Sequence, residues 1–382
     1  MSSEDTSAGG VNPCLTRRRE GRRYAPAIVA PTQDKHGEVL GSAAGLSGAI
    51  AVESGSGLGE QMDVKARGYW EQVWIRFRRD KVAIAGGIFI IFLIAAAFGG
   101  APLAAHMLGH GPNDLFIATG AVDPGTLLPV GPLTRVGNLD GHGTTLLIMG
   151  ADSTLGRDEF LRMLYGAQVS LEVAVFSTVL VMLIGILLGS IAGYYRGWVD
   201  TVVSRITEIT MAFPALLFII ALASTVGPRL DSITFGGLFG KGVVTLTLIF
   251  GAFGWFYPAR IIRSVVLSLR EKEFIEAARM VGAGDMKIIR SHVLPHLVAP
   301  IIVYSTLAVA GYVLGEAGLS FLGLGIKLPT PSWGNLLSVA PDFYTTQPWL
   351  MVWPGLAVLA TTLAFNLLDD GLRDAFDPRA TH

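Results

Sequence analysis

Charged side chains are scarce in this sequence of 382 residues. Lysine, arginine, aspartate and glutamate make up 15% of it, whereas hydrophobic residues make up 51%. Soluble globular chains carry about 25% charged residues, so this chain has too little solvated surface for a soluble protein of its length. Its charges nearly cancel, with a formal net charge of -1, and composition therefore gives no reason to expect a nucleic-acid partner.

Cysteine is almost absent. The single residue, Cys14, excludes a framework of intramolecular disulfides. An apolar leader is also missing from the N-terminal region, because residues 1–66 are polar and rich in glycine, serine, alanine and proline. We therefore expect no cleavable signal peptide, and we expect the first apolar block to act as the membrane signal itself.

Residues 1–66 show no sustained helical or strand periodicity, and we expect them to form a disordered cytoplasmic tail. The tail contains a basic cluster made of Arg17, Arg18, Arg19, Arg22 and Arg23. Such a cluster is either solvated or in contact with anionic lipid headgroups, and we prefer the solvated tail.

Six apolar blocks of a length suited to crossing a membrane follow the tail. They cover approximately Val82–Phe98, Leu171–Tyr194, Ile209–Val226, Val243–Ile262, Val298–Ala317 and Trp349–Leu368. The segment Tyr69–Lys81 mixes aromatic and basic side chains, which is typical of a membrane interface. We predict an all-α, polytopic membrane protein with an interfacial segment and first transmembrane helix at 67–98 and five further helices within 171–368.

Basic residues are distributed unevenly among the connections between these blocks. They are frequent before the first block, between the second and third, between the fourth and fifth, and after the sixth, whereas 318–348 contains only Lys327. Positive residues mark the cytoplasmic side of a membrane protein. We therefore predict that both termini, including a tail at 369–382, are cytoplasmic. Residues 99–170 should form an external loop, in which Asp158–Leu171 has the period of an amphipathic helix.

The connection 269–295 is charged and does not have the composition of a membrane span. Its pattern predicts a helix over Glu271–Val281, a break at glycine, and a second helix that ends before the fifth block. At the break and beyond we assign a permissive backbone to Gly282 and Gly284, a cap to Asp285 and a helix stop to Pro295. Small residues in the first helix leave a smooth face, so we predict that this hairpin docks against another protein.

The hairpin resembles the signature of the permease subunits of bacterial ABC importers. The signature is carried by Glu276, Ala277, Ala278 and Gly282 and, at its end, by Leu294 and Pro295. In that family this loop forms the coupling helix, which sits in a cleft of a separate ATPase subunit. His292 stands where the general signature has isoleucine, and this ending is similar to that of the peptide and nickel branch.

Four further stretches resemble the same branch. They lie at Leu155–Ala167, Tyr194–Ala215, Glu316–Gly325 and Asn366–Arg379, and the resemblance covers approximately residues 70–380. Gln168 departs from the pattern, which usually has an arginine there. The chain is similar to the C-type permeases of dipeptide, oligopeptide and nickel importers.

This resemblance implies a type I importer permease in the cell membrane, and it implies several partners. These are a homologous B-type permease, two ATPase subunits or domains, and an external solute-binding protein, with membrane lipid around the spans. ATP and Mg would be bound by the ATPase subunits, so we expect this chain to have no catalytic residue, cofactor or metal of its own. Di- or oligopeptides are the expected substrates, and nickel chelates are the alternative.

Several ionisable or small residues near the spans are further candidates. Glu316, with Ser320 and Phe321, begins a glycine-rich stretch at the outer mouth, and it either orients that loop or lines the substrate path. Arg205 and Glu208 are three residues apart, which predicts a local ion pair. The glycines of the second span predict close helix packing, and they are Gly185, Gly189 and Gly193.

Two other classes of membrane protein fit the sequence less well. An ion-coupled secondary transporter would show paired acidic residues near mid-membrane and an inverted repeat, and neither is visible. A membrane scaffold or receptor would also use a docking hairpin, and co-purification of stoichiometric ATPase subunits would favour the importer over it. The run Gly237–Gly242 lacks the first glycine and the Ser/Thr of a phosphate loop, so it does not predict ATP binding.

Overall fold

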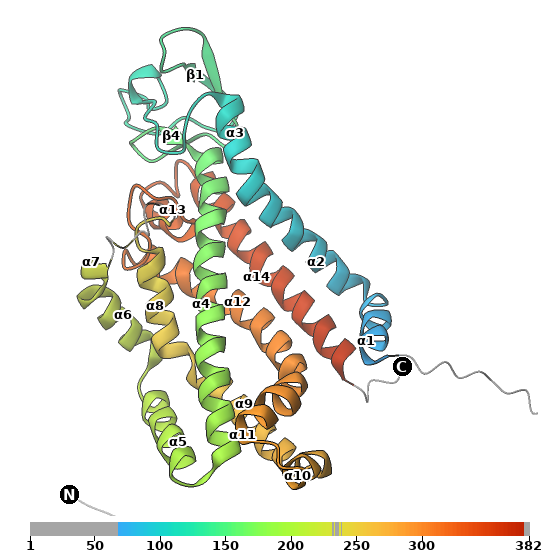
Figure 1. The fold of residues 1–382 in the computed structure, drawn as a ribbon. Coiled ribbons are helices and arrows are strands. Elements are labelled where there is room, and N and C mark those ends of the chain that lie inside the picture. Colours follow the sequence, from blue (N-terminus) through green and yellow to red (C-terminus); the bar gives the residue numbers. More distant parts are fainter. Residues whose placement is uncertain (1–67, 231–232, 234–236, 238, 378–382) are drawn as a thin grey trace, which may run out of the picture. The chain divides into compact units, whose positions relative to one another are not determined.

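The computed structural model describes residues 68–230, 233, 237 and 239–377. The tail predicted at 1–66 lies outside the described residues, and so does the end of the chain after residue 377. Figure 1 shows long helices running between two ends of the described part, one with short strands and the other with α10 and α11. We call these ends the cap end and the hairpin end.

Helices account for most of the described chain. In the first part they are α1 (Tyr69–Phe77), α2 (Lys81–Ile94), the π-helical η1 (Ala95–Gly100), α3 (Ala101–Leu108), the 3-10 turn η2 (Ile117–Thr119), α4 (Glu159–Tyr195), α5 (Gly197–Ala212), α6 (Ala215–Thr225), α7 (Gly227–Leu230), α8 (Val243–Gly254) and α9 (Phe256–Arg270). In the second part they are α10 (Glu273–Met280), α11 (Asp285–Ile288), the π-helical η3 (Ile289–Val293), the 3-10 segment η4 (Leu294–Leu297), α12 (Val298–Phe321), α13 (Trp333–Val339), η5 (Ala340–Asp342) and α14 (Trp349–Phe376).

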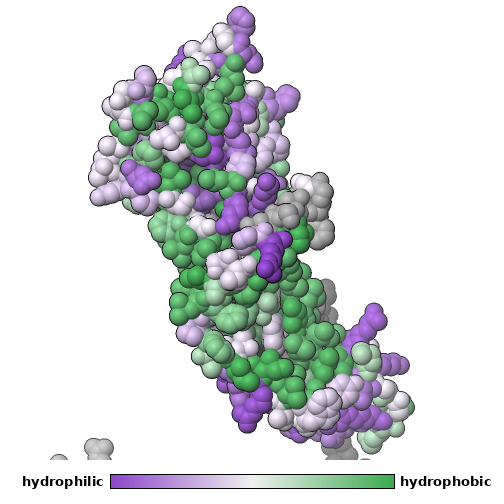
Figure 2. All heavy atoms as spheres, turned by 90° about the vertical axis from the view of Figure 1, so that its left-hand side faces the viewer, coloured by the Kyte–Doolittle hydropathy of each residue, from purple (hydrophilic) through white to green (hydrophobic). Residues whose placement is uncertain are grey.

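Four continuous helical runs in the described residues are long and apolar enough to cross a membrane. They are Lys81–Leu108, Glu159–Tyr195, Asp285–Phe321 and Trp349–Phe376. Two further candidates are bent pairs, with an angle of 86° between α5 and α6 and of 43° between α8 and α9. If each bent pair is one span, the described residues contain six candidate membrane spans, which is the predicted number. Figure 2 shows hydrophobic side chains across the middle of one face, between ends with more hydrophilic residues.

The bend between α5 and α6 corrects the expectation of a continuous third span over Ile209–Val226. Pro214 has no amide hydrogen and disfavours helical backbone in the residue before it. Phe213 accordingly has extended backbone with a ψ of 141°, and α6 begins afresh after the proline. The bend between α8 and α9 is smaller because Trp255 keeps helical dihedral angles.

The longest helix, α4, contains 37 residues, which is about 55 Å at 1.5 Å per residue. It joins the predicted amphipathic helix and the predicted second span into one element. Asp158 caps its first turn, because its carboxylate accepts a hydrogen bond from the Phe160 amide at 2.9 Å. Figure 1 shows α4 extending along the described part from the cap end to the hairpin end.

The packing of α4 against α9 requires glycine. A Cβ atom at Gly189 would lie 2.5 Å from the carbonyl oxygen of Ala259, and one at Gly193 would lie 2.8 Å from that of Arg263. A Cβ at Gly185 would meet Pro258 at 2.7 Å. The predicted close packing at these three glycines is therefore confirmed.

The expected external loop at 99–170 is more ordered than predicted. Its first part continues the first span as helix to Leu108, and its last part belongs to α4. Between them, β1 (Thr134–Gly137) pairs antiparallel with β2 (Thr144–Leu147), and β3 (Ala151–Asp152) pairs antiparallel with β4 (Arg157–Asp158). We call residues 109–158 the cap. Its two small sheets are the exception to the all-α expectation.

The last helix also extends beyond its predicted end. α14 continues to Phe376, so much of the expected tail at 369–382 is helical. α1 is attached to this end, since Arg76 Nη1 donates a hydrogen bond to the Asp377 carbonyl oxygen at 2.8 Å and Trp70 packs edge-on against Phe376. The predicted interfacial segment is thus a helix held against the last span.

Candidate functional site

The hairpin at 269–295 has the predicted helix, break and second helix. Gly282 has a φ of +85°, a backbone conformation that favours glycine, and it ends the first helix as expected. Gly284 has a φ of -70° and a ψ of 153°, which any residue adopts. The permissive backbone is therefore required at Gly282 and not at Gly284.

Two predicted roles in the second helix are wrong. Gly284 is the N-cap of α11, and the Asp285 side chain does not cap the helix. Its carboxylate instead accepts a hydrogen bond from Tyr194 at 2.7 Å. Pro295 does not stop the helix either, because the chain continues through η3 and η4 into α12. The proline lacks an amide hydrogen, and helical geometry persists there as a 3-10 segment.

The hairpin exposes most of the residues that the sequence singled out. Exposed side chains or backbone belong to Glu276, Ala277, Gly282, Gly284 and Pro295, and Ala278 and Leu294 are partly buried. Large apolar side chains are also exposed around the break, at Met280 (83%), Val281 (88%) and Met286 (71%). We call these three residues the apolar tip.

The hairpin keeps its shape through a small core of its own. Ile275 on α10 and Ile288 on α11 are fully buried, and they pack in one cluster with Ile262 and Val266 of α9 and Tyr194 of α4. The apolar tip is therefore held on a packed support. An exposed apolar surface on a supported projection is typical of a protein docking surface.

Tyr194 is a functional candidate that sequence reasoning missed. It belongs to a motif that resembles the family, but its contact with Asp285 spans 91 residues of sequence. Periodicity and spacing describe neighbours along the chain, so they give no signal for this pair.

At the cap end, Glu316 lies inside the protein, with an exposed fraction of 0%. One carboxylate oxygen accepts a hydrogen bond from Ser170 at 2.7 Å, and the other accepts one from Ser320 at 2.6 Å. The Ser320 hydroxyl also accepts a hydrogen bond from the Ile326 amide at 3.0 Å. These contacts favour the interpretation that Glu316 orients the loop after α12, whereas Phe321 is 45% exposed.

A buried group of charges joins the cap to α4. Asp152 forms ion pairs with Arg157 at 2.6 Å and with Arg162 at 2.8 Å. Next to them, His110 Nε2 lies 2.9 Å from Asp158 Oδ2. Burial lowers the pKa of the His110 imidazole, but the hydrogen bond to Asp158 and its negative charge outweigh burial and raise that pKa overall.

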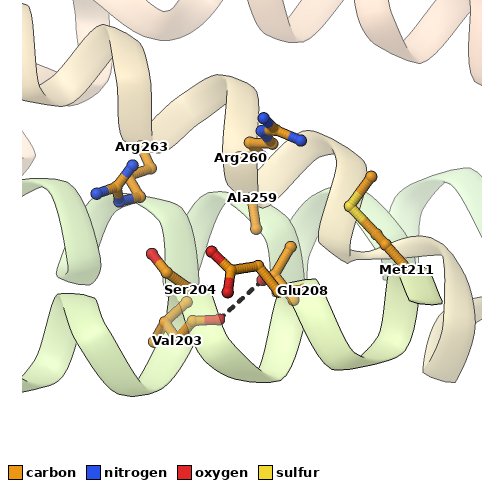
Figure 3. A pocket seen from close by; sticks show the side chains of 8 residues that line it. Val203, Ser204, Glu208, Met211, Ala259, Arg260 and Arg263 are labelled. Atoms are coloured by element: carbon orange, nitrogen blue, oxygen red, sulfur yellow. Dashed lines mark hydrogen bonds between the residues drawn. The ribbon is translucent and has the colours of Figure 1, made fainter.

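A hollow of about 240 Å³ lies between α5 and α9. Figure 3 shows Ser204 and Glu208 on one side of it and Arg260 and Arg263 on the other. Glu208 forms the predicted local ion pair with Arg205 at 2.8 Å. Arg263 crosses between the helices and donates a hydrogen bond to Asp200 at 2.7 Å. The Arg263–Asp200 contact joins α9 to α5, whereas the Arg205–Glu208 pair lies within α5.

Comparison with known proteins identifies the family of this chain. Residues 185–382 match the family described as binding-protein-dependent transport system inner membrane component, and residues 68–117 match the N-terminal transmembrane domain of oligopeptide transport permease C.

Curated relatives cover most of the chain. A glutathione transport system permease protein (GsiD) from Pectobacterium atrosepticum is 35% identical over 83% of this chain and 93% of its own length. A dipeptide transport system permease protein (DppC) from Alkalihalophilus pseudofirmus is 36% identical over 81% and 90%. A GsiD permease from Escherichia coli is 37% identical over the same two shares, 81% and 90%. The chain belongs to the family of inner membrane components of binding-protein-dependent transport systems, as its hairpin and its apolar helices had indicated.

Proposed function

We propose that this chain is one of two permease subunits of an ATP-driven importer of short peptides. In this proposal both termini and the hairpin are cytoplasmic, and a homologous permease completes the translocation path. Two separate ATPase subunits bind ATP and Mg and dock on the hairpin, and a solute-binding protein delivers the substrate at the cap end. The chain itself contributes no ATPase chemistry.

The observation that carries this proposal is the apolar tip on its packed support. Met280, Val281 and Met286 are largely exposed, and they lie at the break between α10 and α11. Burying side chains of this size against a partner stabilises a complex by about 1.5–3 kcal/mol each when the fit is complete. The tip therefore suits the cleft of a partner protein.

A peptide substrate is supported by the relatives. The relatives above are named as glutathione and dipeptide transport permeases, and both substrates are short peptides. Each of these relatives covers more than four fifths of this chain, so the likeness includes the spans as well as the hairpin.

The decisive experiment places a charge or a strained residue in the hairpin. We expect Glu276→Lys and Gly282→Asp to insert normally and to lower ATP-dependent peptide uptake by at least about tenfold, the effect of losing roughly 1.4 kcal/mol of coupling. Gly282→Asp acts on the break because aspartate is strained at a φ of +85°. Uptake is measured in whole cells that express the complete transporter.

Glu71→Lys is the matched control, because Glu71 is an exposed glutamate on α1 and does not belong to the hairpin. We expect it to leave uptake unchanged. Normal peptide uptake by both hairpin variants would refute the proposed coupling role. Purification of the chain without any ATPase subunit, together with uptake that follows a cation gradient, would refute the proposal that the chain belongs to an ATP-driven importer.

A further inference from the structure

Tyr194, in the last turn of α4, is joined to the hairpin by several separate contacts. Its hydroxyl donates a hydrogen bond to Asp285 at 2.7 Å, and its carbonyl oxygen accepts one from Arg270 Nη1 at 2.5 Å. The guanidinium groups of Arg270 and Arg279 lie 5.8 Å and 5.3 Å from the centre of its ring. The residue is buried, with only 3% of its surface exposed.

These contacts reach three successive helices at the hairpin. Arg270 ends α9, Arg279 lies on α10 and Asp285 begins α11. Cation–π contacts of this kind contribute about 0.5–2 kcal/mol each, and hydrogen bonds to charged groups are stronger than those between neutral groups. Tyr194 therefore holds both arms of the hairpin to α4 at one point.

A second attachment lies beside the first. Arg196 follows α4 directly and forms an exposed ion pair with Glu271 at the start of the hairpin. Its φ of +56° is unusual for a residue with a side chain. The chain thus leaves α4 through a constrained turn that is itself tied to the hairpin.

The covalent routes out of the hairpin contain a bend or irregular helical turns, whereas α4 contains neither. Toward the N-terminus, α9 meets α8 at a bend of 43°. Toward the C-terminus, the π-helical η3 and the 3-10 segment η4 separate α11 from α12. Such irregular turns often mark hinges or kinks in a helix. α4 runs without a break from Tyr194 to the cap end.

The other end of α4 is also bonded to its surroundings. Ser170 donates a hydrogen bond to the buried Glu316 of α12 and accepts one from the Trp333 amide of α13 at 3.4 Å. A displacement of α4 along its axis therefore changes contacts at both ends. A uniform helix moves as a unit, because its main-chain hydrogen bonds lie within the segment.

We propose that Tyr194 is a positioning residue through which movement of the hairpin is passed to α4, and that α4 carries this movement to the cap end. This inference rests on the proposed function, in which ATPase subunits grip the hairpin. Tyr194 touches no substrate or nucleotide in this scheme. Its role is to make the hairpin and α4 move together.

The test compares two substitutions in the complete transporter reconstituted in proteoliposomes with its binding protein. Tyr194→Phe keeps the ring near the two guanidinium groups and removes one hydrogen bond, whereas Tyr194→Leu removes the ring as well. We expect the amount of peptide transported per ATP hydrolysed to fall at least about fivefold in Tyr194→Leu and by less in Tyr194→Phe. The KM for ATP should not change, since the nucleotide sites lie in other subunits.

Tyr195 provides controls, because it is the adjacent tyrosine and is 46% exposed. Tyr195→Phe and Tyr195→Trp keep an aromatic ring where Tyr195 packs edge-on against Tyr194, and both should keep the wild-type ratio of peptide to ATP. A second measurement guards against loss of folding in Tyr194→Leu: Tyr194→Phe, Asp285→Ala and their double variant should show non-additive losses, since each single change removes the same hydrogen bond.

The outcomes separate the two proposals. If the wild-type chain assembles with no ATPase subunit and supports no ATP-dependent uptake, the proposed function fails, and the inference falls with it. If the wild-type transporter works and the Tyr194 variants keep the same peptide-to-ATP ratio as the Tyr195 variants, the inference alone is overturned.

Discussion

Glu316 and His110 show how single polar residues join distant segments of this chain. Each oxygen of the Glu316 carboxylate accepts a hydrogen bond from a serine hydroxyl, one on α4 and one on α12, so replacing Glu316 would leave buried donors without an acceptor. His110 is held in the cap by Asp158, the residue that also caps α4. In both cases a polar pair fixes the place where the cap end meets the spans.

His110 makes the stability of the cap depend on pH. Its folded pKa is raised above the ordinary value of 6.5, so the folded cap favours the protonated imidazole. The contribution of the His110–Asp158 pair is therefore fully present below the unfolded pKa and is lost as pH rises through the folded pKa. Hydrogen exchange of cap amides, corrected for intrinsic rates, should be slower at about pH 6 than at about pH 8.5.

His110→Gln should abolish this dependence, because glutamine does not titrate. His142→Gln is the control, since His142 is an exposed histidine in the same cap. Equal protection at both pH values in the unchanged protein would contradict the prediction.

Residue contacts were predictable from the sequence only where they are local. The Arg205–Glu208 pair follows from helical spacing and is present. The partner of Asp285 was not predictable. The sequence predicted that Asp285 is the N-cap of the second hairpin helix, because aspartate near a helix start often has that role. Ser170 and Glu316 are 146 residues apart, and no pattern along the chain connects them.

At the scale of elements, hydropathy predicted where the helices lie but not how they bend. The blocks correspond to α2, α4, α12 and α14 and to the two bent pairs. Their lengths were underestimated, because helices such as α4 and α14 continue into polar sequence beyond the apolar stretch. The cap sheets were missed because strands of two to four residues are too short to show an alternating pattern.

The glycines of α4 give a prediction for a helix pair. Gly189→Leu should prevent α9 from approaching α4, because even a Cβ at this position would lie 2.5 Å from a carbonyl oxygen. Overpacking of this kind costs about 1–3 kcal/mol, and the thermal midpoint of the detergent-solubilised protein should fall. The midpoint is measured as the loss of the monodisperse fraction after heating.

Gly355→Ala is the control for this change. Gly355 lies inside α14, and a Cβ there would meet nothing within 4 Å. It should keep or slightly raise the midpoint, because alanine favours helix more than glycine does. A midpoint for Gly189→Leu equal to that of Gly355→Ala would contradict the assigned packing.

For the whole molecule, the two ends should face opposite sides of the membrane. Basic residues concentrate in the segments that meet at the hairpin end, such as α1 and the hairpin, and they are sparse in the connection 318–348. The positive-inside rule then places the hairpin end in the cytoplasm and the cap outside. In the proposed function, this orientation would let an ATPase bind the hairpin while a solute-binding protein reaches the cap.

Cysteine labelling tests the orientation directly, because the chain has a single native cysteine. In a Cys14→Ser background, Met280→Cys places a thiol on the apolar tip and Leu139→Cys places one in the turn between β1 and β2, at sites 83% and 46% exposed. A membrane-impermeant maleimide added to intact cells that express the chain without its partners should label the cap thiol only. After permeabilisation it should label both, which shows that the hairpin thiol is reactive. Labelling of Met280→Cys in intact cells would place the hairpin outside, where no ATP-hydrolysing partner reaches it, and the proposed transport mechanism would then be untenable.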